Sequence, residues 1–309
     1  MKILNVVTTH RPFFVDQCRA IRSCGVELDT IRVPGPESTA KSRSFSDYIK
    51  FYINIIRKVS ARDYDLIHAN FGNTIPFAIC QPNRPVIATL WGSDIMRENE
   101  GLRKFIKCFS KRCDTVVLPS KKMASYYPSD HKYIPFGVDT EKFKPFSQTK
   151  AREKVGWNQY DDIVLFPYPG NRKVKNYSLA RKVVSKLEGT TLKRLDGISH
   201  DRVSLYMNAA DALLVTSKRE SGPMVIKEAA LCNLPVISTD VGFASDILSD
   251  IKNSFVCGSF NELVEKLQNV IHSSSRSDGH KYRKKWGLTK MGNEYLNVYK
   301  STINQYSNR

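Results

Sequence analysis

The sequence lacks a long apolar run and a paired-cysteine pattern. Its longest apolar stretches, such as Phe51–Ile56, are broken by charge well short of the ~18–20 residues that a membrane span requires. Near the N-terminus the short apolar run Ile3–Val7 is cut off by His10 and Arg11, so we expect no secretion signal. The seven cysteines are odd in number and none is spaced as CxxC, which disfavours a disulfide framework and a zinc site. We therefore expect a cytoplasmic protein with reduced thiols and no metal.

Acidic residues are scarce relative to basic ones. The 309 residues include 48 Lys and Arg against 30 Asp and Glu, which gives a formal net charge of +18. The basic residues are densest over Arg103–Arg112, where Phe105, Ile106 and Phe109 interleave with them. Such a basic amphipathic segment is typical either of contact with an anionic membrane surface or of a solvated helix whose apolar residues face the core. No zinc-finger or RRM signature accompanies the charge, so nucleic acid is not an expected partner.

Short β-rich apolar runs alternate with amphipathic stretches along most of the chain. The predicted strands are Ile3–Val7, Val26–Val33, Asp65–Ala69, Pro85–Leu90, Thr115–Pro119, Ile163–Pro167, Thr191–Leu195, Ala212–Thr216 and Pro235–Thr239. Many lack in–out alternation, as expected for parallel strands that are covered on both faces. Helical patterns such as Phe14–Ser23 and Tyr177–Leu187 lie between them. The rhythm predicts an α/β protein with doubly wound parallel sheets.

The rhythm pauses around Pro135–Thr149, and the length favours two domains. We therefore predict an N-terminal domain over residues 1–148 and a C-terminal domain over residues 149–309. Residues 281–305 have helical character and no strand follows them. In such sheets ligands bind outside the carboxyl ends of the strands, so loops at those ends are the candidate sites.

The most informative segment runs from Thr216 to Glu228. A strand ends at Thr216, and Pro223 suits the first position of a helix that extends to Asn233. The N–H groups of Met224, Val225 and Ile226 would then point out of the helix N-terminus, beside a partial charge of roughly +0.5. Gly222 leaves room for an approaching anion. The segment therefore predicts a seat for phosphate.

Two carboxylates flank this predicted seat. Glu220 precedes the helix, and Glu228 lies roughly 7–8 Å along the axis from Pro223. Each alone is compatible with an ordinary surface charge. Because carboxylates accept hydrogen bonds from hydroxyls, the pair suggests a ligand with a sugar, a diphosphate and a ribose in series.

Cations for such a diphosphate occur at the start of the second half. Arg172 and Lys175 lie in a loop between a predicted strand and a predicted helix, where they could clamp a diphosphate. A leaving nucleoside diphosphate gains negative charge in the transition state, which cations placed in advance would stabilise.

With these motifs the sequence resembles the retaining GT-B glycosyltransferases of family four over nearly its whole length. The motifs are Asp65-Leu-Ile-His-Ala-Asn-Phe-Gly72, Pro85-Val-Ile-Ala-Thr-Leu-Trp-Gly-Ser-Asp-Ile95, Ile134-Pro-Phe-Gly-Val-Asp-Thr-Glu-Lys-Phe143, Arg172 with Lys175-Asn176, Asn208-Ala-Ala-Asp-Ala-Leu-Leu-Val-Thr-Ser217 and Glu220-x7-Glu228. The resemblance implies the GT-B fold, in which two Rossmann-like domains face each other across a cleft. It further implies that the first domain binds the acceptor, that the second binds the sugar nucleotide, and that the terminal helix returns to the first domain.

The resemblance also implies a role for each matching residue. Arg172 and Lys175 would hold the diphosphate, Glu220 would contact hydroxyls of the donor sugar, and Glu228 would hold the ribose. Gly222, Pro223, Met224 and Val225 would line the donor through their backbone. Transfer would proceed with retention, with no cofactor and no metal.

The chain departs from the family pattern on the acceptor side. Trp91-Gly92 stands where many members have His-Gly, and the loop Thr8–Phe13 replaces a glycine-rich loop. We take His10, Trp91 and Asp94 as acceptor-side candidates.

The sequence therefore predicts a hexosyltransferase-type enzyme. It would move a sugar from a nucleotide-diphosphate-sugar, UDP- or GDP-linked, to a hydroxyl of a glycan or a lipid-linked acceptor. It would work in the cytoplasm or peripherally on the inner face of a membrane, docked there through Arg103–Arg112. Two alternatives remain open: a GT-B epimerase or hydrolase of sugar nucleotides, and a basic, non-enzymatic surface or nucleic-acid binder.

Overall fold

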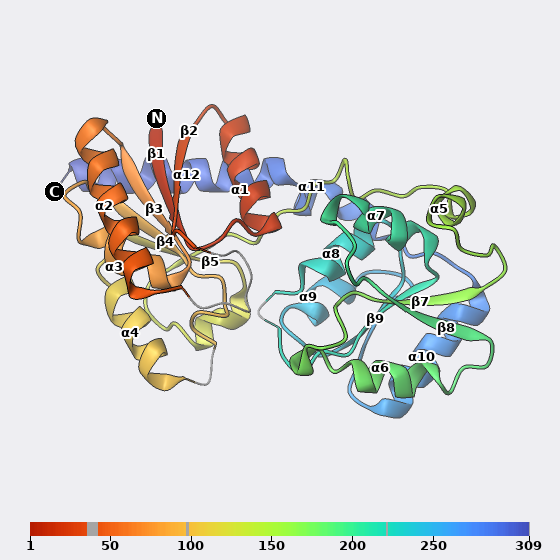
Figure 1. The fold of residues 1–309 in the computed structure, drawn as a ribbon. Coiled ribbons are helices and arrows are strands. Elements are labelled where there is room, and N and C mark those ends of the chain that lie inside the picture. The colour runs from red at the N-terminus through yellow and green to blue at the C-terminus, as the bar shows by residue number, and fades with distance from the viewer. Residues whose placement is uncertain (36–42, 97–98, 221, 309) are drawn as a thin grey trace. The chain divides into compact units, whose positions relative to one another are not determined.

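The computed structural model describes residues 1–35, 43–96, 99–220 and 222–308. Contacts divide the described chain into two compact units (Figure 1). The first comprises Met1–Gly137 together with the segment from Leu288 onward, and the second comprises Val138–Gly287. Each unit is built on a parallel sheet.

The first unit has the strand order β2-β1-β3-β4-β5-β6. Its strands are β1 (Lys2–Val7), β2 (Glu27–Arg32), β3 (Leu66–Asn70), β4 (Val86–Thr89), β5 (Thr115–Leu118) and β6 (Lys132–Tyr133). Its α-helices are α1 (Pro12–Ser23), α2 (Phe45–Ala61), α3 (Ile75–Ile79), α4 (Glu100–Ser110) and α12 (Leu288–Ser307). Short 3₁₀ turns, η1 (Gly72–Thr74) and η2 (Lys121–Ser125), follow β3 and β5.

Helices cover both faces of this sheet. On one face α2, α3 and α4 pack Phe51, Ile75 and Ile106 into one apolar cluster with Leu4 and Val6 of β1. On the other face, α12 packs so closely on α1 that a side chain on Gly292 would meet the backbone oxygen of Ala20 at 2.4 Å. The C-terminal helix therefore belongs to the first unit.

The second unit has the strand order β11-β10-β9-β7-β8. Its strands are β7 (Asp162–Phe166), β8 (Thr190–Arg194), β9 (Ala212–Val215), β10 (Val236–Thr239) and β11 (Phe255–Cys257). Its α-helices are α5 (Gln148–Val155), α6 (Tyr177–Val184), α7 (His200–Ala209), α8 (Met224–Leu231), α9 (Ala244–Leu248), α10 (Phe260–Ser273) and α11 (Arg283–Trp286). The turns η3 (Lys173–Lys175) and η4 (Gly279–Tyr282) complete it.

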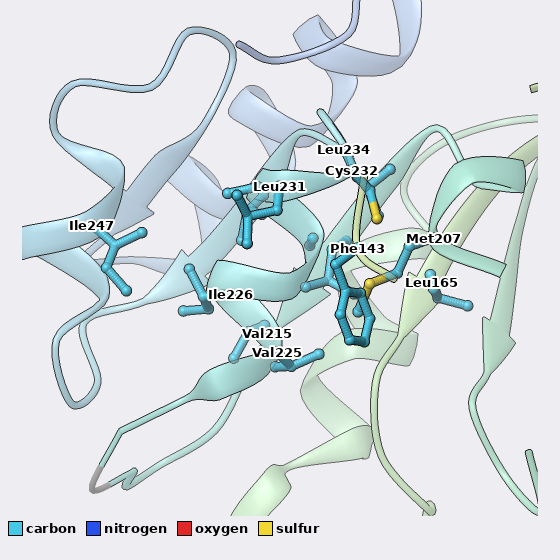
Figure 2. Close-up of a cluster of buried hydrophobic side chains, with 14 of the residues drawn as sticks. Phe143, Leu165, Met207, Val215, Val225, Ile226, Leu231, Cys232, Leu234 and Ile247 are labelled. Atoms are coloured by element: carbon cyan, nitrogen blue, oxygen red, sulfur yellow. The ribbon is translucent and has the colours of Figure 1, made fainter. Parts of the chain in front are cut away.

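Helix α8 is anchored in the core of the second unit. Its Val225, Ile226 and Leu231 are buried with Leu165 of β7 and Val215 of β9 (Figure 2). Since burial of a large aliphatic side chain contributes about 1.5–3 kcal/mol, this packing fixes where the helix begins relative to the strand ends.

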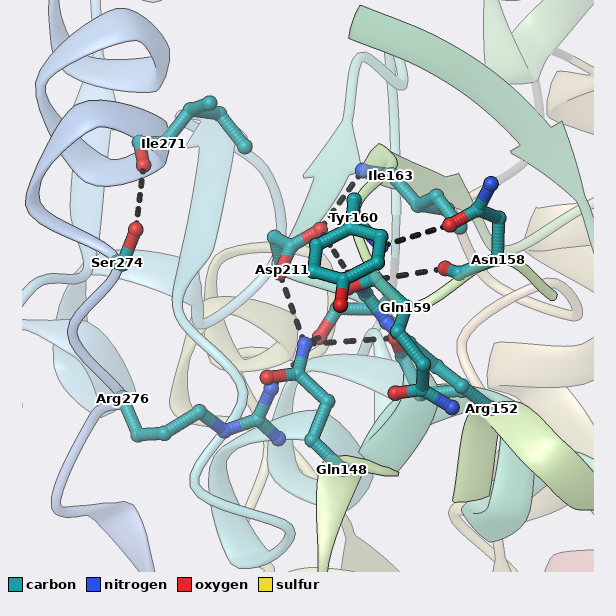
Figure 3. A network of polar contacts seen from close by, with 12 residues as sticks. Gln148, Arg152, Asn158, Gln159, Tyr160, Ile163, Asp211, Ile271, Ser274 and Arg276 are labelled. Atoms are coloured by element: carbon teal, nitrogen blue, oxygen red, sulfur yellow. Dashed lines mark hydrogen bonds and ion pairs between the residues drawn. The ribbon is translucent and has the colours of Figure 1, made fainter. Parts of the chain in front are cut away.

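A partly buried ion pair ties helix α5 to the sheet. The guanidinium of Arg152 donates to Asp211 Oδ2 at 2.8 Å and to the backbone oxygen of Ala209 at 3.0 Å. The other oxygen of Asp211 accepts from Gln148, and Oδ2 also accepts from the N–H of Ile163 (Figure 3). The start of β7 is thus fixed to the segment that leads into β9.

Each predicted strand is present to within about two residues, and the predicted doubly wound parallel sheets are confirmed. The units divide after Gly137, whereas the sequence placed the boundary after residue 148. The reason is that Val138 donates to the backbone oxygen of Trp286 and Phe143 lies in the core of the second unit. The predicted helix over 281–305 is interrupted at Gly287, where the chain passes from one unit to the other. None of the described helices combines the length and apolarity needed to cross a membrane.

Candidate active site

Glu220 lies at the carboxyl ends of β7 and β9, where three side chains converge on it. The Tyr168 hydroxyl and the Ser217 hydroxyl each donate to Oε1 at 2.8 Å, and the Lys175 ammonium pairs with the same oxygen. Only 11% of the Glu220 side chain and 6% of the Lys175 side chain are exposed. The sequence-predicted residues Lys175 and Glu220 are therefore brought together directly.

Burial shapes the charge of this cluster. It lowers the pKa of Lys175, while the negative charge of Glu220 opposes that shift. Burial and the same carboxylate raise the pKa of Tyr168, so its hydroxyl stays protonated at neutral pH and donates to Glu220. Lys175 Nζ also lies 3.9 Å from the centre of the Tyr168 ring, a cation–π contact. Within the described part of the chain, Oε2 of Glu220 makes no hydrogen bond, so one oxygen of a fixed carboxylate is available to a ligand.

The N-terminus of α8 follows Glu220 closely. Pro223 caps the helix, which begins at Met224 and ends at Leu231 rather than at Asn233. The N–H of Ile226 donates to the Pro223 oxygen at 3.0 Å, so the prediction that it points outward is wrong. Among the described residues, the N–H groups of Met224 and Val225 have no partner in the structure. The predicted seat thus offers two backbone donors instead of three.

Two glycines permit the close packing behind this helix start. A side chain on Gly222 would meet Phe243 at 2.5 Å, and one on Gly242 would meet Pro223 at 2.7 Å. Gly242 also has a φ of +58°, which other residues rarely adopt. Gly222 is therefore required by packing, in addition to the ligand access for which the sequence singled it out.

Glu228 is held by a chain of side chains from α7 and its neighbourhood. His200 Nε2 lies 3.3 Å from Glu228 Oε1, and His200 Nδ1 lies 2.9 Å from Lys142 Nζ. Because a lysine ammonium can only donate, Nδ1 accepts and Nε2 carries the proton that points at Glu228. Only 12% of the Glu228 side chain is exposed. Lys142 in turn pairs with Asp201 at 2.8 Å.

Arg172 is exposed and stands apart from this buried network. It lines a hollow of about 380 Å³ together with Lys173, Arg181 and Lys218. The positive charge of Arg172 contributes to lowering the pKa of Lys175, so the two cations are close enough to repel each other. The Lys218 N–H donates to the Val174 oxygen at 2.9 Å, which joins the loops after β7 and β9. This basic hollow suits an anionic group.

The acceptor-side candidates all lie in the first unit, in different environments. His10 is exposed and stacks on Phe14. Trp91 is 8% exposed and packs edge-on against Phe13, and its indole Nε1 has no hydrogen-bond partner in the described chain. Asp94 is 1% exposed; its Oδ2 accepts from the N–H groups of Gly72 and Trp91 at 2.9 Å, and its Oδ1 accepts from Trp91 at 3.1 Å. A role in acceptor binding stays a prediction for all three, and the bonds of Asp94 favour a structural one.

Sequence reasoning missed the groups that hold the two glutamates. Tyr168 follows β7 inside the Pro-Tyr-Pro segment, and Ser217 follows β9, so their places after strand ends were a usable signal. His200 is not among the predicted site residues, because nothing in the sequence places it beside Glu228. Among the described residues, no group of His, Cys, Asp and Glu is arranged to hold a metal ion.

Part of the chain that carries this site is similar to known glycosyltransferases. Residues 189–287, which include Glu220 and Glu228, match the model of the family "Glycosyl transferases group 1". TuaC of Bacillus subtilis, named for teichuronic acid biosynthesis, is 25% identical over 228 residues, which is 62% of this chain and 58% of TuaC. A glycosyltransferase of Methanocaldococcus jannaschii is 25% identical over 279 residues, covering 81% of this chain and 79% of its own.

Solved structures share the fold at lower sequence identity. Sucrose-phosphate synthase from Thermosynechococcus elongatus has a TM-score of 0.81 and 14% identity, with 99% of this chain and 100% of that chain covered. HepE from Anabaena, solved with UDP-glucose, has a TM-score of 0.73 and 15% identity, with 97% and 100% covered. The solved structures and the two parallel-sheet units show the GT-B fold, and residues 189–287 are similar to group 1 glycosyltransferases.

Proposed function

We propose that the protein is a retaining glycosyltransferase that takes a sugar from a nucleotide-diphosphate-sugar and gives it to a hydroxyl of a glycan or lipid-linked acceptor. The observation that carries the proposal is Glu220, which Tyr168, Ser217 and Lys175 fix beside the N-terminus of α8. The structure of HepE with UDP-glucose supports a nucleotide donor.

Each part of the donor has a matching group in the second unit. The free oxygen of Glu220 would accept from a hydroxyl of the sugar, since its other oxygen is already occupied. The N–H groups of Met224 and Val225, with Gly222 and Pro223 before them, would receive the diphosphate. Glu228, oriented by His200, would accept from the ribose hydroxyls.

The cations would act on the leaving group. Lys175 is held within the site by Glu220, and Arg172 stands at the basic hollow beside it. As the bond between the sugar C1 and the phosphate oxygen breaks, negative charge develops on the diphosphate, and these cations stabilise it. Their charge would serve in place of a metal ion, so we propose that transfer needs none.

We further propose a front-face path, which the resemblance around Glu220-x7-Glu228 implies. The acceptor oxygen bonds to C1 on the face that the diphosphate leaves, and the acceptor proton passes to the departing phosphate oxygen. The products are the glycoside and a nucleoside diphosphate. In this path the protein positions and stabilises, and no side chain is required as a base.

The test is turnover of a panel of UDP-, GDP- and ADP-sugars, chosen first by thermal shift because ligand binding raises apparent stability. On the donor that binds, we expect Glu220→Gln to lower turnover by about 100-fold. Glu220→Gln keeps an acceptor oxygen for Tyr168 and Ser217 but removes the charge that faces Lys175, so folding of the variant is checked by urea denaturation before turnover is compared. Arg172→Ala should cost about tenfold, the value of a charged hydrogen bond.

The matched control is Glu265→Gln, an exposed carboxylate on α10 of the same unit. It should leave turnover within twofold. If both variants, Glu220→Gln and Arg172→Ala, turn over the donor as fast as the wild type does, the site assignment is wrong. Free sugar or an epimerised sugar nucleotide formed at full rate without an acceptor would favour the hydrolase or epimerase instead.

A further inference from the structure

Helix α2 carries a second apolar face besides the one that it buries. Phe51, Ile55 and Val59 face the sheet, as an amphipathic helix requires. Phe45, Ile49 and Ile53, spaced four residues apart, are 82%, 46% and 42% exposed. Spacing by four places them in one row along the helix. We call this row the α2 stripe.

Helix α4 adds an exposed aromatic residue and a concentration of cations. It turns Ile106 toward the core, while Phe105 is 47% exposed and rests against Phe109 with ring centres 4.5 Å apart. Lys104 and Lys111 are exposed as well. Of the apolar residues in Arg103–Arg112, Ile106 therefore faces the core and Phe105 faces outward, and contact of this segment with a membrane stays a prediction.

The two helices belong to one layer, because Phe51 and Ile55 of α2 and Ile106 of α4 pack into the same cluster on one face of the sheet (Figure 1). Their outward sides therefore lie on the same side of the first unit. Lys50 and Arg57 are exposed on α2 near the stripe.

The acidic residues of these helices are engaged locally. Asp47 bonds to Ser44 at the start of α2, and Glu100 pairs with Lys104 at 3.0 Å. The outward surface of the layer is thus apolar along the first half of α2 and basic around it.

We propose that the outward surface of α2 and α4 docks on an anionic lipid bilayer. Phe45, Ile49 and Ile53 would enter the boundary between headgroups and acyl chains, and the lysines of α4 would lie at the lipid phosphates. A nucleic acid would attract the cations but gain nothing from a row of isoleucines. A second copy of a chain with net charge +18 would bring like charges together. The inference goes beyond the proposed function and does not rest on the donor site.

The experiment is co-sedimentation of the full chain with vesicles of phosphatidylcholine alone or with 30 mol% (about one third) phosphatidylglycerol, in low and high salt. We expect binding only to the anionic vesicles, and weaker binding in high salt. The double variant Ile49→Asn with Ile53→Asn should reduce partitioning at least tenfold. The triple variant Lys104→Gln, Lys107→Gln and Lys111→Gln should do the same, because each cation near an anionic surface contributes about fivefold.

Controls of equal chemistry come from the second unit. Lys150→Gln, Lys182→Gln and Lys186→Gln together remove the same charge, and Tyr160→Asn removes a side chain of a residue that is 96% exposed. Both should leave partitioning within twofold. Thermal shift with UDP in the absence of vesicles is measured for every variant, so failure of the donor assignment is seen separately.

Three results would overturn the proposal. One is a wild-type chain that does not bind anionic vesicles, and another is binding that survives in both the stripe variant and the lysine variant. The third is a wild-type dimer in sedimentation velocity that the stripe variant converts to a monomer, which would make the stripe an interface between copies. A wild-type chain that binds DNA but not anionic vesicles would be an instance of the first result.

Discussion

Asp94 of the first unit and Glu220 of the second each stand five residues beyond the end of a strand, β4 and β9 respectively. Backbone N–H groups occupy the oxygens of Asp94, and 1% of the residue is exposed. Side chains from neighbouring loops hold one oxygen of Glu220, whose side chain is 11% exposed. A carboxylate whose oxygens accept hydrogen bonds from nearby backbone N–H groups stabilises a loop. A carboxylate that side chains orient through one oxygen, with the other oxygen unbonded, is prepared for a ligand.

The largest effect that sharpens this contrast is on folding stability. Asp94→Ala leaves the buried N–H groups of Gly72 and Trp91 without an acceptor, and each such group costs about 1–3 kcal/mol. We expect the free energy of unfolding, measured by urea denaturation, to fall by about 3 kcal/mol. UDP affinity, measured by calorimetry on the folded variant, should be unchanged.

Asp63→Ala, which removes an exposed carboxylate from the same unit, is the control and should alter unfolding by less than about 0.5 kcal/mol. An Asp94→Ala protein as stable as the wild type, but with tenfold weaker acceptor transfer, would reverse the assignment and make Asp94 an acceptor ligand.

The sequence predicts features that depend on local patterns, and it misses contacts between residues that are distant in the chain. Strands were predictable because runs such as Ile163–Pro167 are apolar on both faces, and the Glu220-to-Glu228 segment was predictable because Gly222 and Pro223 signal a helix start after a strand. β11 was missed, since its three residues are too few to form a pattern. The partners of Glu228 were also missed. The contact between His200 and Glu228 arises from the packing of α7 against α8, and no pattern of residues along the sequence predicts it.

A smaller effect is expected from crowding the helix start in the second unit. Gly222→Ala would place a methyl group 2.5 Å from the Phe243 ring, which must then move and carry the start of α8 with it. Overpacking typically costs about 1–3 kcal/mol, so we expect UDP affinity to fall by about tenfold. The matched control is Gly258→Ala, because its added methyl group would meet nothing closer than 3.8 Å. Unchanged UDP affinity in Gly222→Ala would show that the donor does not use this helix start.

The smallest effect concerns pH and again separates the units. His68 is buried in the first unit, where its ring nitrogens bond to Tyr299 at 2.7 Å and Thr89 at 2.8 Å. Burial lowers the pKa of His68 from 6.5 to about 3, so the folded protein keeps it neutral where the unfolded chain is protonated. Since the unfolded state then binds more protons, stability falls as the pH drops from about 6.5 toward 3 and is independent of this group at higher pH.

Urea denaturation at pH 7.5 and 5.5 should therefore show a loss of about 1.4 kcal/mol from this residue. The His68→Gln variant has no titrating group at this position. It should be less stable than the wild type at pH 7.5, but its free energy of unfolding should fall by about 1.4 kcal/mol less between pH 7.5 and 5.5. The control His10→Gln, at an exposed histidine of the same unit, should keep the wild-type pH dependence. If His68→Gln and the wild type lose equal stability between the two pH values, His68 takes up a proton in the folded protein over the same pH range as in the unfolded chain. The buried polar groups of the first unit would then be as accessible to a proton as Glu220 is to a ligand, and the contrast between the two units would fail.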